Sequence, residues 1–149
     1  MSLTLDEARA LHAEVHVLDL HADTAKLMDK LGYDLAARHE RPMPKAINVF
    51  GHVDLPRMRD GGMAGQFFSF WTTPYPERGC ARAVTRQLDA LDQAMANHPE
   101  QLAWTRTGAD VRAAKAAGKI AALGGIEGGQ ALEGDIETIE AFSRRGVRY

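Results

Sequence analysis

The sequence has few of the features that mark secreted or membrane-bound proteins. Its single cysteine, Cys80, excludes a disulfide within the chain, which fits a reducing compartment. No apolar run approaches the roughly 20 residues that span a bilayer. The N-terminus lacks the basic start and apolar core of a signal peptide. From these absences we expect a cytoplasmic protein without a membrane segment.

An excess of charge of one sign is also lacking. The formal net charge is −2, so no basic surface suggests a nucleic-acid partner. The 149 residues are 45% hydrophobic and 26% charged, which is typical of a globular domain with a core. We find no internal repeat and no low-complexity tract. These values favour a folded domain that acts on a small molecule or another protein.

Apolar runs alternate with helical patterns along the chain. The runs predict strands at 15–20, 63–71, 102–105 and 119–127, and the start of another at 147–149. Apolar spacing and capping signals predict helices at about 4–13, 24–35, 77–97, 107–117 and 135–145. Residues 39–44 contain two prolines and are expected to form a loop.

This alternation indicates a parallel sheet with right-handed connections, either a doubly wound open sheet or a β/α barrel. The first strand lacks a following phosphate-binding glycine loop, and residues 124–129 lack the Gly-x-Gly-x-x-Gly spacing, which favours the barrel. We therefore predict an α/β fold, a parallel TIM-like barrel of which the chain supplies the first four strands and the start of the fifth. Such a barrel usually needs about 250 residues.

From that length we expect residues 1–149 to be the N-terminal part of a single barrel domain. Four strands cannot close a barrel, and the outer strands would expose unpaired edges. The remainder of the barrel would come from the same protein or from a second chain. A homodimer is a further arrangement that we leave open.

The stretch Asp19-Leu20-His21-Ala22-Asp23 ends the first predicted strand. Side chains alternate along a strand, so Asp19, His21 and Asp23 are predicted to share one face. An imidazole nitrogen and a carboxylate oxygen aimed at one point suit a divalent metal such as zinc. His-x-Asp is nevertheless short enough to arise by chance, and Asp19 could equally cap the following turn.

Glu127 ends the fourth predicted strand, directly before two glycines. An acid at the end of a buried apolar run favours a functional role over a solvated one. Barrel enzymes place their chemistry at the carboxyl ends of strands, so Glu127 is expected near His21 and Asp23. The remaining histidines fall on predicted helix surfaces, on the opposite strand face or in the long connection that follows the first predicted strand, and we expect them to stay outside this site.

Five motifs, in this order, resemble those of the membrane dipeptidases, also called renal dipeptidases. They are Asp19-x-His21-x-Asp23, VDLPRMRDGG at 53–62, GQFFS at 65–69, GIEGG at 125–129 and GVRY at 146–149. The resemblance runs from about Val17 to the last residue. Each motif is modest alone, but five in the right order are specific.

The resemblance implies a β/α-barrel metallopeptidase that hydrolyses dipeptides, often L-Xaa-D-Xaa, with a water held between two Zn²⁺ ions. By matching position, His21 and Asp23 are ligands of one zinc, and Glu127 bridges both ions and is the catalytic residue. Trp71 falls where the family places an aromatic that faces the substrate. Asp19, on the same predicted strand face as His21, is expected to support that ligand without binding the metal itself. The family's remaining zinc-binding and substrate-binding histidines align beyond Tyr149.

Two other functions stay open. Another barrel metal-dependent amidohydrolase, such as a deaminase, would normally carry His-x-His after the first strand, and Asp23 argues against it. A non-catalytic half-barrel that binds a partner is the second alternative, because the matched residues do not form a complete two-metal site. Metal content separates these classes.

Overall fold

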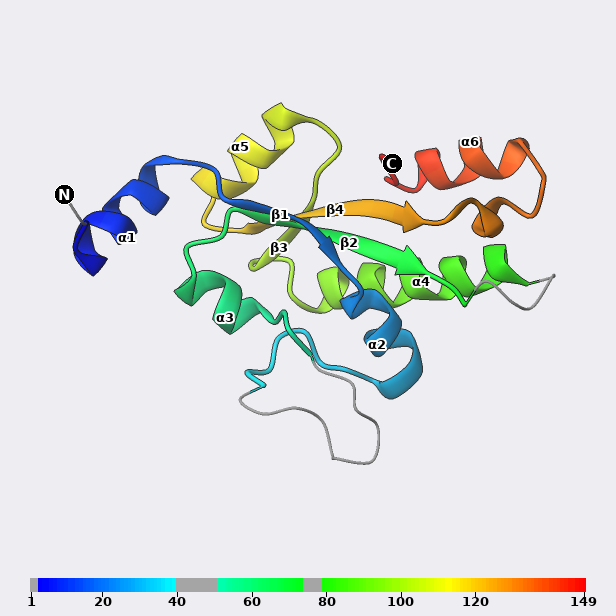
Figure 1. Cartoon of the computed structure of the whole chain (residues 1–149), viewed down its shortest axis with the longest axis horizontal. Helices are drawn as coiled ribbons and strands as arrows, with labels where there is room; N and C mark the ends of the chain where they lie inside the picture. Colours follow the sequence, from blue (N-terminus) through cyan, green and yellow to red (C-terminus); the bar gives the residue numbers. More distant parts are fainter. Residues whose placement is uncertain (1–2, 40–50, 74–78) are drawn as a thin grey trace.

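The structure is a computed structural model that describes residues 3–39, 51–73 and 79–149. Its centre is a parallel sheet of four strands: β1 (Leu18–Ala22), β2 (Gly65–Trp71), β3 (Leu102–Trp104) and β4 (Ile120–Glu127). Helices lie on both sides of this sheet (Figure 1). They are α1 (Leu5–Glu14), α2 (Thr24–Leu31), α3 (Leu55–Asp60), α4 (Cys80–Asn97), α5 (Gly108–Ala116) and α6 (Glu137–Arg144), with a 3-10 turn, η1 (Gly129–Leu132).

The strands lie in the order β1-β2-β4-β3, so β4 pairs directly with β2. Seven register pairs join these two strands, from Gly65 beside Ala121 to Trp71 beside Glu127. The short β3 pairs only with the first half of β4, on its outer edge. Further along the same edge, Val147 forms a parallel bridge to Gly124. The sheet therefore continues through the predicted start of a strand at 147–149, and β3 is a short addition beside it.

The main core lies between the sheet and α4. The side chains of Phe68 and Phe70 from β2 and of Leu88 and Leu91 from α4 are fully buried. The predicted apolar stripe of α4 thus faces the sheet, as its spacing of three and four residues requires. A smaller cluster on α5 and β4 contains Val111, Ala114, Ala121 and Leu123.

Several element bounds differ from the sequence prediction. The helix predicted to reach residue 35 ends at Leu31, because Gly32 takes a left-handed conformation (φ 63°) that stops it. Helix α3 was not predicted, since six residues are too few to show a periodic pattern. Helix α1, predicted at about 4–13, runs from Leu5 to Glu14 and buries none of its residues. Residues 40–44 of the predicted loop and the predicted helix start at 77 lie outside the described residues.

Strand β1 also departs from prediction. Helix α1 runs to Glu14, and the strand begins at Leu18. Asp19 pairs with Gln66 and Ala22 with Phe68, so β1 carries one extra residue in this interval. Asp23 lies outside the strand, at the N-cap of α2. Strict alternation is therefore the wrong account of where these side chains point, although His21 and Asp23 do meet.

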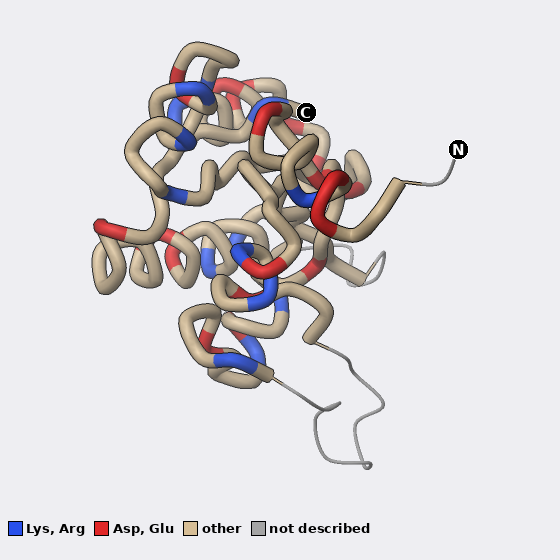
Figure 2. Tube along the Cα trace, turned by 90° about the vertical axis from the view of Figure 1, so that its left-hand side faces the viewer, with Lys and Arg blue, Asp and Glu red and all other residues tan. Residues whose placement is uncertain are grey.

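Positively and negatively charged residues are mixed along the trace (Figure 2). None of the helices among the described residues is both long enough and apolar enough to cross a membrane.

The fully buried Asp54 is the N-cap of α3 and also binds the backbone of His39. One carboxylate oxygen accepts a hydrogen bond from the Arg57 backbone N–H (2.8 Å). The other accepts from the His39 backbone N–H (2.9 Å) and from Arg57 Nε (2.6 Å). Burial raises the pKa of Asp54, but the hydrogen bonds from His39 and Arg57 outweigh it, so the pKa lies below its ordinary value.

We expect Asp54→Asn to lower the free energy of unfolding by about 2–4 kcal/mol at neutral pH. The asparagine NH2 group would replace one accepting oxygen and would lie against N–H donors that then lack an acceptor. Urea denaturation measures the loss. A depressed folded-state pKa means that this stabilisation is complete above the unfolded pKa of about 3.9 and is lost as the pH falls through the folded pKa. The difference between the two proteins should therefore shrink below about pH 4.

Asp60→Asn is the matched control, because Asp60 is exposed and its ion pair with Arg38 is a surface one. Equal losses in the two variants, or a difference that persists in acid, would contradict this account of Asp54.

Candidate metal centre

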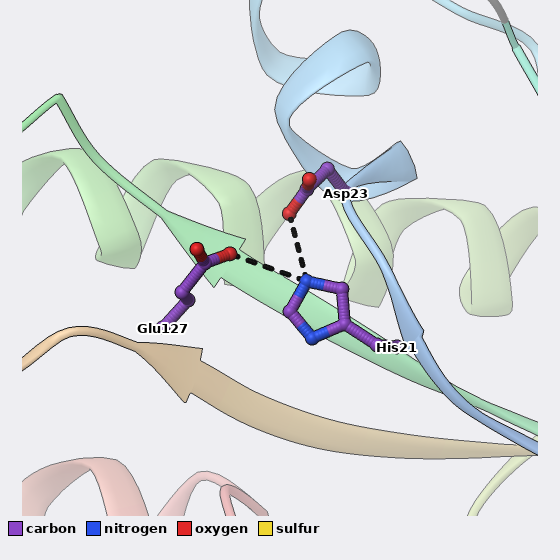
Figure 3. A group of neighbouring side chains, drawn as sticks. All are labelled: His21, Asp23 and Glu127. Atoms are coloured by element: carbon purple, nitrogen blue, oxygen red, sulfur yellow. Dashed lines mark ion pairs between the residues drawn. The ribbon is translucent and has the colours of Figure 1, made fainter.

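Three side chains meet at the carboxyl edge of the sheet (Figure 3). His21 Nε2 lies 3.6 Å from Asp23 Oδ1 and 3.2 Å from Glu127 Oε2. One ligand atom from each residue lies within 4.8 Å of the other two. Each side chain is about half exposed, between 46% and 52%, so a solute can reach the group.

Strand order explains why this group forms. β2 lies between β1 and β4, so the His21 imidazole meets Glu127 across the strand that separates them (Figure 3). The extra residue in β1 turns the backbone at this point, and the Asp19 carboxylate accepts a hydrogen bond from the His21 N–H (3.0 Å). Asp19 therefore contacts the backbone of His21 and not its ring.

Asp23 is placed by helix α2. It occupies the N-cap, where an aspartate usually accepts a hydrogen bond from a backbone N–H of the first turn. Its carboxylate makes no such bond and faces His21 instead. The helix thereby forgoes a stabilisation of about 1 kcal/mol, which favours a functional role for this carboxylate.

The donor set fits zinc. Atoms bound at about 2.0–2.2 Å to one tetrahedral ion lie roughly 3.3–3.6 Å apart. The distances from the His21 nitrogen to the two carboxylate oxygens, 3.6 and 3.2 Å, are close to that range. One imidazole and two carboxylates also leave a coordination position open, as catalytic zinc sites require. Within the described parts of the chain, no other group of three His, Cys, Asp or Glu side chains comes this close.

Trp71 lies beside this group. It is the register partner of Glu127 and is half-buried. The buried Gln87 fixes its backbone, donating to the Trp71 carbonyl (2.9 Å) and accepting from its N–H (3.2 Å). The position agrees with a residue that faces the substrate, and that role stays a prediction.

Two neighbours of the site were missed by sequence reasoning. The Tyr149 hydroxyl donates to the Leu20 carbonyl (2.7 Å), and its ring occupies the space where a side chain on Gly125 would lie. Burial raises the pKa of Tyr149, with further contributions from the carboxylates of Asp19, Glu127 and Asp23. Lys26 is the second neighbour, and its helical spacing from Asp23 was a usable signal. Nothing in the sequence pattern placed Tyr149 here.

The structure brings together the three predicted metal ligands, His21, Asp23 and Glu127, and their roles as ligands stay predictions. The other histidines stay outside the group. His12 contacts the Gly61 carbonyl, for example, and His39 stacks on Tyr33.

A parallel sheet flanked by helices, with an imidazole and two carboxylates at its carboxyl edge, is the arrangement of β/α-barrel metalloenzymes. The family model for membrane dipeptidase, peptidase family M19, matches residues 5–149. The chain belongs to the membrane dipeptidase family.

Relatives and solved structures agree with this assignment. The dipeptidase ataJ of Aspergillus terreus is 30% identical over 109 residues, which are 66% of this chain and 26% of that protein. The structure of dipeptidase AC, a family M19 metallopeptidase, has a TM-score of 0.71 and 25% identity, covering 90% of this chain and 41% of that one. A Rhodobacter sphaeroides metallopeptidase, liganded with a phosphinate mimic of L-Ala-D-Ala, has a TM-score of 0.70 and 21% identity, covering 90% and 44%.

These comparisons confirm the predicted fold, a TIM-like barrel of which this chain is a part. The chain spans about a quarter of the curated relative and about two fifths of the two solved structures.

We expect the chain to bind zinc through this group. Isothermal titration should give a dissociation constant that rises by at least about tenfold in His21→Ala and in Glu127→Gln, because each change removes one of three ligands. His98→Ala is the control. His98 lies between the end of α4 and the start of β3, near the amino ends of the strands, whereas the metal-ligand group lies at their carboxyl ends. Unchanged affinity in both ligand variants would show that zinc binds elsewhere.

Proposed function

We propose that the complete protein is a zinc dipeptidase that hydrolyses the peptide bond of dipeptides, with His21, Asp23 and Glu127 holding metal. The observation that carries this proposal is the convergence of these three side chains in a chain of the membrane dipeptidase family. The bound phosphinate in the Rhodobacter sphaeroides structure mimics L-Ala-D-Ala. It supports dipeptides of the L-Xaa-D-Xaa type as the first substrates to test.

Glu127 is the residue that suits a bridge between two zinc ions. One of its carboxylate oxygens faces His21, and the other has no hydrogen bond within the described parts of the chain. A free oxygen on the same carboxylate could reach a second ion, whose other ligands would come from the rest of the barrel. We propose that the rest of the barrel is supplied by the same protein or by a second chain. A homodimer and a cytoplasmic location are also part of the proposal.

The chemistry divides between metal and protein. Zinc, when bound, supplies a nucleophile at neutral pH and a Lewis acid for the peptide carbonyl. Asp23 and Glu127 offset the positive charge at the site, and Glu127 can also accept a proton. His21 donates its Nε2 lone pair as a neutral imidazole. On the same face of the sheet, the Tyr149 ring packs against Phe67, with 5.2 Å between the ring centroids.

An amidohydrolase of the deaminase type is less well supported. Such enzymes would place a second imidazole where this chain has Asp23. The observed group contains two carboxylates and a single imidazole, which agrees with the dipeptidase pattern.

We expect the complete protein to hydrolyse L-Ala-D-Ala, with kcat/KM reduced at least about 100-fold in His21→Ala and in Glu127→Gln, and unchanged in His98→Ala. Removing metal with a chelator should abolish hydrolysis, and zinc should restore it. A coupled assay for free D-alanine measures the rate. Hydrolysis that survives both chelation and Glu127→Gln would contradict the proposal.

A further inference from the structure

Lys26 lies on the first turn of α2, three residues after Asp23. Its Nζ is 3.3 Å from the centroid of the Trp71 ring, a close cation–π contact. Trp71 is the register partner of Glu127. The aromatic ring therefore holds the ammonium group beside the metal-ligand group, at the carboxyl edge of the sheet.

The ammonium group has three N–H donors but no acceptor. Within the described residues, the Lys26 ammonium group contacts the Trp71 ring and forms no hydrogen bond or ion pair. Lys30, one turn further along the same helix, forms an ion pair with Asp29 (3.2 Å). Burial lowers the pKa of Lys26, while the Asp23 and Glu127 carboxylates act in the opposite direction. The charge is thus partly desolvated and within the field of the site.

A partly buried cation without an acceptor is unfavourable unless a ligand supplies one. The proposed substrate can do so, because every dipeptide carries a terminal carboxylate and an acidic one carries a second on its side chain. The carboxylates of Asp23 and Glu127 would repel such an anion, and a positive group beside them offsets that repulsion. The contact with the Trp71 ring also restricts the position of the ammonium group, which reduces the entropy lost when it binds.

We propose that Lys26 is a specificity-determining residue whose ammonium group, held on Trp71, donates to a carboxylate of the substrate. This inference rests on the proposed dipeptidase function. It concerns a residue outside the metal-ligand set, and it distinguishes a substrate contact from a simple counter-charge for the acidic site. A counter-charge would alter metal affinity and affect all substrates alike.

The test compares Lys26→Met, Lys26→Arg and the control Lys30→Met in the complete zinc-loaded protein. The substrates are L-Ala-D-Ala, L-Ala-D-Glu and the C-terminal amide of L-Ala-D-Ala. We expect Lys26→Met to lower kcat/KM for at least one free dipeptide by about 10- to 100-fold, mainly through KM. Lys26→Arg should recover most of the loss, Lys30→Met should behave as wild type, and zinc content should not change.

The substrates identify which carboxylate is bound. An equal loss for both free dipeptides, with none for the amide, assigns Lys26 to the terminal carboxylate. A loss confined to L-Ala-D-Glu assigns it to an acidic side chain. An unchanged kcat/KM, an equal loss that includes the amide, or a loss of zinc in Lys26→Met overturns the inference.

The wild-type protein separates this failure from that of the proposed function. Active wild type with an unaffected Lys26→Met variant removes only the role of Lys26. A zinc-loaded wild type that hydrolyses none of the dipeptides removes the dipeptidase proposal, and the role of Lys26 with it.

Discussion

The parallel register between β2 and β4 is the constraint on which the site depends. Because the two strands keep one register over seven pairs, Glu127 pairs with Trp71 at the carboxyl end of the sheet. His21, near the end of β1, lies at the same end. Close packing at the other end supports this register. A Cβ on Gly65 would lie 2.9 Å from the carbonyl oxygen of Ala121 and from the Leu18 side chain, so the three strands approach there without room for a side chain. A shift of one residue would turn Glu127 to the opposite face and separate it from His21.

Around the site, the local structure lacks some stabilising interactions because its charged side chains face the site instead. Asp23 leaves the helix it begins without a side-chain cap, and the extra residue in β1 interrupts its pairing with β2. Three carboxylates, from Asp19, Asp23 and Glu127, act on the same tyrosine, and Lys26 lies close by without an acceptor. Such a concentration of like charge is unfavourable, and a divalent cation would offset it. The same local departures from ideal structure are expected where a fold carries function.

Much of the fold could be predicted from the sequence, because its signals are local. The alternation of strands and helices gave the parallel sheet, and the apolar spacing of α4 gave its buried face. The order of motifs gave His21, Asp23 and Glu127 as a group. The position of β3 outside β4 could not be predicted, since strand order is decided by tertiary pairing and not by any one segment. The extra residue in β1 was missed for the same reason, because it is visible only against the register of β2. Lys26 could have been predicted from its helical spacing from Asp23. Tyr149 could not, because it lies beside the site through contacts across the sheet with Leu20, Phe67 and Gly125.

The central claim is that one imidazole and two carboxylates at this edge bind a common metal ion. The most direct measurement is anomalous diffraction at the zinc edge from crystals of the zinc-loaded protein. The account predicts an anomalous peak about 2.0–2.2 Å from His21 Nε2 and from an oxygen of Asp23 and of Glu127. A peak bound by other residues, with His21 still paired to Asp23 and Glu127, would contradict it.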